Sequence, residues 1–173
     1  HKVDENGNEE WSFYYPDISG VEAFDVTLDE GFILVGTGYD ESEDDTDIII
    51  LKIDQFGAEQ WRKYLGSNGH GEGKAIHQLA DGSFVVAGYT IPEINNSQYY
   101  LLKIDVDGNE IWSHNYGNNG YQTCEDMKVT SDGGFILVGD WEGQVGILKT
   151  DSNGIEEYFN TINCAGISYG RSV

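Results

Sequence analysis

An eleven-residue block occurs four times in the chain, and this internal repeat constrains the fold more than any other feature. The copies are HKVDENGNEEW at 1–11, LKIDQFGAEQW at 51–61, LKIDVDGNEIW at 102–112 and LKTDSNGIEEY at 148–158. A second block, such as LDEGFILVG or SDGGFILVG, lies between successive copies and keeps Phe32, Phe84 and Phe135 in register. Two landmarks that share one period of about 50 residues indicate a chain of repeated structural units.

Each unit carries four segments with strand character. In the first full unit these segments are residues 22–28, 32–39, 47–54 and 58–65, and the second and third are rich in Ile, Val, Leu and Phe. The link DQFGAE joins the last two segments through an Asp that caps the turn and a Gly that accepts a positive φ. The link DEG between the first two is also typical of a hairpin.

Four antiparallel strands in about 50 residues predict the blade of a β-propeller, because no segment has the helical period of about 3.6 residues. We therefore expect an all-β chain that forms a single repeat domain over 1–173. The expected parts are full blades at 22–71, 72–122 and 123–161, a partial blade at 1–21, and the first strand of a further blade at 162–173.

Both predicted ends fall inside a blade, and each leaves a strand edge unpaired. An open edge favours association with another chain. We therefore expect either a longer parent protein or an assembly in which another chain completes the blade. A compact four-bladed ring is the alternative.

An aromatic residue ends each copy of the repeat block. A blade cannot bury both of its faces alone, so blades must stack on one another. We expect these aromatic residues to pack between neighbouring blades: Trp11, Trp61, Trp112 and Tyr158. Their shared register favours this role over that of ordinary strand aromatics.

These residues resemble the tryptophan-docking blades of quinoprotein-like (PQQ-like) propellers, in which a Trp follows the turn Gly by four residues. Gly7, Gly57 and Gly108 keep this spacing. The chain is also similar to secreted bacterial and archaeal repeat proteins with K-x-D-x-x-G-x-x-x-W followed by D-G-G-[FY]-[IV]-x-x-G. The resemblance covers nearly the whole chain and implies a propeller fold in an extracellular or cell-surface setting. It does not imply quinone chemistry, because the metal-ligand and cofactor-stacking residues of those enzymes match no position here.

The composition excludes several classes of partner. The 173 residues include 9 Lys and Arg against 31 Asp and Glu, which gives a formal net charge of −22. Such a surface repels nucleic acid and anionic membranes, and no apolar run reaches the length of about 20 residues that spans a membrane. Aromatic residues make up 13% of the chain, which indicates a folded core rather than disorder.

One turn has the opening of a metal-binding pattern. The segment DVDGNE at 105–110 has the initial oxygen spacing of a calcium loop. However, His114 stands where that pattern requires a Glu, and the equivalent turn has Phe56 in place of an oxygen donor. We therefore interpret the segment as a capped turn and predict no cofactor, with calcium as the alternative. The acidic run at 40–47 is interpreted as a solvated hairpin tip.

No catalytic arrangement is recognised in the sequence. His70 and His114 lack ligand spacing with an acidic partner, and no Ser-His-Asp, dinucleotide or Walker pattern occurs. His77 aligns with Asp25 and Lys128 in the first strands of the units, so we expect it to face the central channel or its solvent, as a lone exposed histidine rather than a ligand. We predict no catalytic, cofactor-binding or metal-binding residue, and therefore no enzyme.

Two covalent modifications are predicted. Cys124 and Cys164 lie in or before first strands of successive units, which would run side by side, so a disulfide between them is a hypothesis. Asn95 begins an N-x-S sequon in a polar loop and is a candidate glycan acceptor.

Together these patterns favour a noncatalytic, secreted or cell-surface propeller module with a structural or interaction role. The loops at 64–73 and 116–123 would present Tyr and Asn to a protein or glycan partner. The alternative is a repeating subunit of an extracellular fibre, in which open ends add head to tail. A quinoprotein-like or glycan-cleaving enzyme is the third hypothesis, which a cluster of buried carboxylates around a funnel would support.

Overall fold

The computed structural model describes residues 1–40, 45–65, 70–93 and 96–163. This part of the chain contains fourteen strands and no helix. The strands form three four-stranded antiparallel sheets and one two-stranded hairpin. The predicted all-β class and the four-stranded antiparallel unit are confirmed.

In each large sheet the strands pair in the order of the sequence. The N-terminal hairpin consists of β1 (Lys2–Val3) and β2 (Glu9–Trp11). The first sheet consists of β3 (Ile18–Val26), β4 (Phe32–Asp40), β5 (Asp45–Ile53) and β6 (Glu59–Leu65). The second consists of β7 (Gly71–Gln78), β8 (Phe84–Glu93), β9 (Asn96–Ile104) and β10 (Glu110–Tyr116). The third consists of β11 (Gln122–Val129), β12 (Phe135–Trp141), β13 (Gln144–Thr150) and β14 (Glu156–Ile162).

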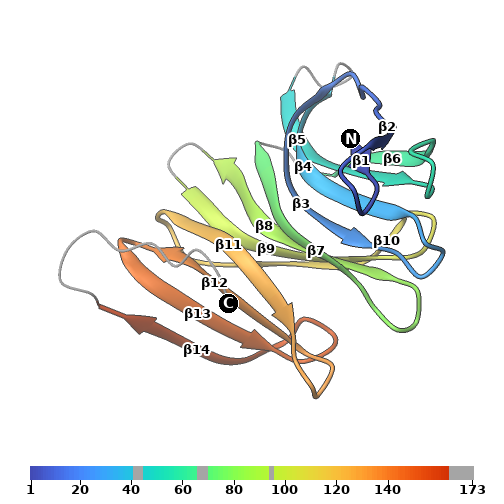
Figure 1. The fold of residues 1–173 in the computed structure, drawn as a ribbon. Coiled ribbons are helices and arrows are strands. Elements are labelled where there is room, and N and C mark those ends of the chain that lie inside the picture. Colours follow the sequence, from blue (N-terminus) through green and yellow to red (C-terminus); the bar gives the residue numbers. More distant parts are fainter. Residues whose placement is uncertain (41–44, 66–69, 94–95, 164–173) are drawn as a thin grey trace.

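The sheets follow one another face to face, from the first (blue to cyan in Figure 1) through the second to the third (orange to red). Strand β7 contacts β3, β4 and β5 of the first sheet, and β11 contacts β7, β8 and β9 of the second. Within the described residues the three sheets do not close into a ring. The predicted further strand at 162–173 lies almost entirely outside the described residues.

The first strand of the unit differs from its prediction, because β3 covers Ile18–Val26 instead of residues 22–28. It begins earlier because β4 is long enough to provide ladder partners up to Gly38, which pairs with Ile18. It ends earlier because the backbone of Thr27 already belongs to the turn and donates its N–H to Gly31 O at 2.9 Å.

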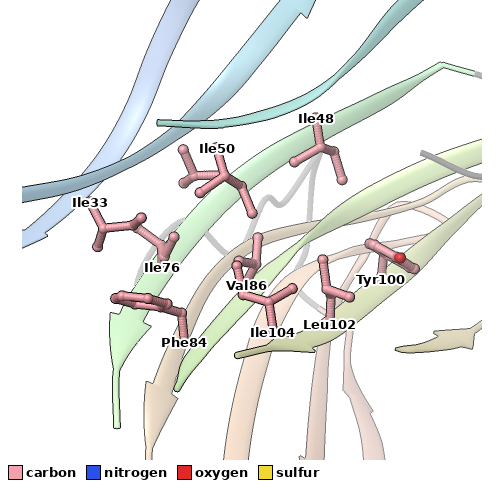
Figure 2. Close-up of a cluster of buried hydrophobic side chains, with 10 residues drawn as sticks. Ile33, Ile48, Ile50, Ile76, Phe84, Val86, Tyr100, Leu102 and Ile104 are labelled. Carbon is pink, nitrogen blue, oxygen red and sulfur yellow. The ribbon is translucent and has the colours of Figure 1, made fainter. Parts of the chain in front are cut away.

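The second sheet buries both of its faces. On β8, Phe84 and Val86 pack against the first sheet, whereas Val85 and Ala87 pack against the third. Figure 2 shows the cluster between the first two sheets, where Ile33 and Ile50 meet the side chains of β7, β8 and β9. The alternation of strand side chains thus lets one strand serve two cores, which explains its nearly continuous apolar sequence.

A β-bulge occurs at the same place in the first strand of all three sheets. The extra residues are Glu22, Lys74 and Glu125, which lie between the register shifts of the ladders. Opposite each bulge is the Gly that ends the second repeat block. A Cβ on Gly88 would lie 2.0 Å from the carbonyl oxygen of Glu72, and Gly36 and Gly139 are equally crowded. The repeated Gly is therefore required by close backbone approach at the bulge.

Candidate interaction surface

The tryptophans of the repeat block lie between successive sheets. Each ring contacts the phenylalanine that begins the second strand of the next sheet, with centroid separations of 6.1 Å for Trp11–Phe32, 6.2 Å for Trp61–Phe84 and 6.1 Å for Trp112–Phe135. The fourth aromatic residue, Tyr158, lies on β14 and is 53% exposed. The three tryptophans share one packing geometry, in which the fourth predicted residue does not take part.

Each tryptophan also rests on the turn glycine of the next sheet. A Cβ on Gly57 would lie 2.9 Å from the ring of Trp11, and Gly57 has φ +85°. The turn is fixed by Asp54, whose Oδ1 accepts the N–H groups of Phe56 at 2.8 Å and Ala58 at 2.9 Å. A side chain at this glycine would therefore clash with the indole and strain the turn.

A lysine on the third strand of each full sheet holds the hairpin turn between the first two strands. Its Nζ lies close to an Asp of that turn, at 2.9 Å for Lys52–Asp29, 3.1 Å for Lys103–Asp81 and 3.1 Å for Lys149–Asp132. Hydrogen bonding by the Thr27 hydroxyl, with a further contribution from Lys52, lowers the pKa of Asp29 to about 2. Ser83 and Lys103 likewise lower the pKa of Asp81 to about 2.

The N-terminal hairpin contains the equivalent lysine, Lys2, but the described residues contain no equivalent of the turn whose Asp pairs with it in the full sheets. In repeat register, β1 and β2 correspond to the third and fourth strands of a sheet, so Lys2 corresponds to Lys52. Lys2 pairs with Glu10 at 2.7 Å, and its side chain is 38% exposed. In contrast, the side chain of Lys52 is only 6% exposed.

The outer face of the first sheet is open beside this hairpin. Phe24 on β3 is 65% exposed, although its counterparts Ile76 and Met127 in the next two sheets are 1% and 0% exposed. It lines a groove of about 350 Å³, together with Trp11, Phe32, Leu34 and residues of β1. The groove is predominantly apolar, so it can take up apolar side chains of a protein partner.

The face of the second sheet that carries Ile76, the counterpart of Phe24, is covered by the first sheet. There, Ile76 belongs to a cluster that includes Ala23 of β3 and Ile33 and Val35 of β4. The hairpin β1–β2 includes no counterpart of these two strands. Among the described residues, no counterpart of these two strands covers Phe24.

Of the three residues predicted to be modified, the structure describes Cys124. Cys124 carries a fully buried thiol, and burial raises its pKa. Its predicted partner Cys164 and the predicted glycan acceptor Asn95 lie outside the described residues, so both modifications stay predictions.

The turn considered for calcium is capped by the side chain of Asp105. Oδ1 of Asp105 accepts the N–H groups of Asp107 at 2.9 Å and Asn109 at 2.8 Å, and Oδ2 accepts the amide of Asn109 at 3.0 Å. These bonds lower the pKa of Asp105. Among the described residues there is no group of three or more His, Cys, Asp or Glu side chains placed to hold a metal ion. Most of the acidic run at 40–47 lies outside the described side chains.

The side chain of His77 is 29% exposed, with Nδ1 at 3.5 Å from Asp25 Oδ2 on β3 and Nε2 at 3.2 Å from the carbonyl oxygen of Met127 on β11. The imidazole therefore contacts the first strands of both the first and the third sheets. His114 contacts the carbonyl oxygen of Asn153 at 3.0 Å, in the turn of the following sheet.

Sequence reasoning missed Lys2 and Phe24 as candidate contact residues. Both stand in repeat register with residues that are less exposed in later units, so the neighbouring strands rather than the local sequence set them apart.

No protein-family model matches the chain, and a search of the curated proteins finds no match. In the described part of the chain, no helix is long and apolar enough to cross a membrane.

Proposed function

We propose that the chain is a noncatalytic module of the β-propeller type, extracellular or at a cell surface, with a structural and protein-binding role. The propeller assignment is supported by the tryptophan contacts that recur at three interfaces in one geometry. The resemblance to secreted tryptophan-docking repeats supports the setting. The observation that carries the binding role is the open face of the first sheet, where Phe24 is 65% exposed.

The apolar character of this face favours a protein over a glycan. Exposed apolar patches beside aromatic residues are typical of protein interfaces. A partner sheet would bury Phe24 and the groove beside Trp11 in the way that the first sheet buries Ile76.

The proposal is tested by extending the chain with one more set of strands. Residues 71–101 of this chain are duplicated in front of His1, so that Leu101 precedes His1 in repeat register. The added strands should cover Phe24 and raise the melting temperature, because burying one large apolar side chain stabilises by about 1.5–3 kcal/mol. For a chain of this length, that corresponds to about 3–12 °C in calorimetry.

The matched control carries Val85→Asp and Ala87→Asp in the added copy only. These positions face the following sheet in the native second unit, so the charged version cannot pack on Phe24. Equal melting temperatures for the extended chain, the control and the original chain would contradict the proposal that the face of the first sheet around Phe24 packs against a further sheet.

Self-assembly is the second candidate, and the opposite end of the molecule favours it. On β14, the last described strand, Tyr158 is 53% and Ile162 is 46% exposed. Copies that pack this surface on the exposed face beside Phe24 would join head to tail. Sedimentation velocity distinguishes the two: a fibre subunit forms species that grow with concentration, whereas a binding module sediments as one discrete particle.

A further inference from the structure

We propose that His77 is a proton-dependent link between the first strands of the three sheets, which holds them together more firmly as the pH falls from about 8 to about 5. The imidazole lies on β7, between β3 of the first sheet and β11 of the third. Two observations carry this inference: the acceptor atoms that face both ring nitrogens, and the excess of carboxylates on the three strands. It concerns the packing of the sheets and does not depend on the proposed binding role.

Both ring nitrogens of His77 face oxygen atoms that accept hydrogen bonds and cannot donate them. Nε2 lies 3.2 Å from the carbonyl oxygen of Met127, and Nδ1 lies 3.5 Å from Oδ2 of Asp25. A neutral imidazole carries a single N–H, so when it donates to one oxygen it turns a lone pair toward the other. The imidazolium carries both N–H groups, so it donates to Met127 and forms an ion pair with Asp25. Protonation therefore strengthens the contacts of β7 with both β3 and β11.

The two partners of the imidazole are fixed by their own contacts. Oδ1 of Asp25 accepts the N–H of Val26 at 2.9 Å, and Oδ2 accepts the N–H of Gln78 at 3.1 Å. Met127 is fully buried in the cluster between the second and third sheets. Protonation therefore changes the strength of the link without requiring either partner to move.

The charges around His77 favour a cation at this position. The three first strands carry five carboxylates against two lysines, an excess of three negative charges: Glu22 and Asp25 on β3, Glu72 and Lys74 on β7, and Glu125, Asp126 and Lys128 on β11. The other strands that contact β7 have their acidic residues at the ends away from His77: Asp40 on β4, Asp45 and Asp47 on β5, and Glu93 on β8. Lys52 of β5 is paired with Asp29 in its own sheet. A negative surrounding of this kind stabilises the imidazolium.

A lysine on the same strand provides a permanent form of this link. Nζ of Lys74 lies 2.8 Å from Glu72 and 3.5 Å from Glu22 of β3. Burial opposes its charge, but the hydrogen bond to Glu72 and the charges of Glu22 and Glu125 raise the pKa of Lys74. Lys74 therefore stays charged at any pH at which a histidine titrates. On the three first strands, His77 is the residue type that changes its charge between about pH 5 and about pH 8.

Urea unfolding of the full chain at about pH 8 and about pH 5 tests the inference with His77→Gln, which retains a donor for Met127 but cannot gain a charge. The original chain should gain stability over the variant as the pH falls, because a group that holds its proton more tightly in the folded state stabilises the fold when protonated. The expected gain is about two- to fivefold in the folding equilibrium constant, the contribution of one ion pair that is partly exposed. In the Asp25→Asn background, this gain should be at least halved.

His114→Gln is the matched control. His114 contacts one acceptor, the carbonyl oxygen of Asn153 at 3.0 Å, and its ring lies against Trp112. A neutral imidazole satisfies this single contact, so the stability difference between the original chain and His114→Gln should be the same at both pH values. A measurement on the unaltered chain does not require any variant to fold: in NMR spectra of the imidazole nitrogens, His77 should stay doubly protonated to a higher pH than His114.

Four outcomes overturn the inference. The first is a stability difference between the original chain and His77→Gln that does not change with pH, and the second is an equal gain measured with His114→Gln. The third is a gain that Asp25→Asn reduces by less than half. The fourth is the loss of the second imidazole proton by His77 and His114 at the same pH.

Discussion

Lys52 Nζ lies 2.9 Å from Asp29 Oδ2, and this ion pair ties the third strand of the first sheet to the turn between its first two strands. Lys52 also donates to the carbonyl oxygen of Ile53 at 3.2 Å and to Gln60 at 2.8 Å. The charge is thus almost fully surrounded by acceptors, which explains how a lysine is tolerated in the sheet with 6% of its side chain exposed. The pair recurs in every full sheet, so it belongs to the architecture rather than to one site.

This pair predicts a stability contribution that disappears in acid. The folded-state pKa values of Asp29 and Asp81 are lowered to about 2 from an ordinary 3.8. A lowered carboxyl pKa stabilises the fold above the ordinary value and loses its effect as pH falls through the folded one. Asp29→Asn with Asp81→Asn should therefore lower stability at pH 7 by about 0.2–1 kcal/mol each, since both groups are exposed and screened.

The pH profile is the decisive measurement for these carboxylates. The difference between the double variant and the original chain should shrink as the pH is lowered from about 4 to about 2 in urea unfolding experiments. Asp107→Asn, at an exposed turn position, serves as the control and should change little at any pH. A difference that is constant down to pH 2 would show that the two Asp side chains act without their charge.

Trp61 should contribute more to stability than its counterpart in the last sheet. Trp61 packs on Phe84 across an interface, so Trp61→Ala should cost at least about 2 kcal/mol in urea unfolding. Tyr158→Ala removes the aromatic ring at the same register position, where it is 53% exposed, and should cost less than about 1 kcal/mol. Equal costs would mean that the aromatic ring acts within its own sheet rather than between sheets.

The glycine opposite the bulge should not tolerate a methyl group. A Cβ at Gly88 would lie 2.0 Å from the carbonyl oxygen of Glu72, so Gly88→Ala should destabilise the chain by about 1–3 kcal/mol or more. Gly20→Ala is the matched control on β3, because a Cβ there meets nothing within 4 Å. It should stay within about 0.5 kcal/mol of the original chain. Unchanged thermal melting of Gly88→Ala would contradict the packing at the bulge.

The sequence predicts the strands of the unit well because their signals are local. The segments 32–39 and 58–65 fall within one residue of β4 and β6, since a turn with an Asp and a Gly precedes each strand. The start of β3 at Ile18 is not predicted, because it depends on how far β4 extends as a pairing partner. The bridging contacts of His77 also depend on the spacing of strands from three sheets, which no single segment encodes.

The candidate surface is beyond sequence reasoning for a similar reason. Phe24 and Ile76 occupy the same register position and have similar local patterns, yet one is 65% and the other 1% exposed. Only the neighbouring sheet differs. Whether a repeat residue is core or surface therefore depends on the strands that pack on it, and its local sequence does not specify them.

The same pair of residues provides the last prediction, which ties the open face to stability. Ile76→Ala should cost about 2–5 kcal/mol in urea unfolding, because Ile76 is buried between two sheets. Phe24→Ala should cost less than about 1 kcal/mol, although it removes the larger side chain, because Phe24 is mostly in solvent. In the chain extended by residues 71–101, however, Phe24→Ala should become as costly as Ile76→Ala, since the added strands would bury the ring. A loss of stability from Phe24→Ala that is large in the original chain, or that stays small in the extended one, would show that the face of the first sheet around Phe24 does not pack against added strands.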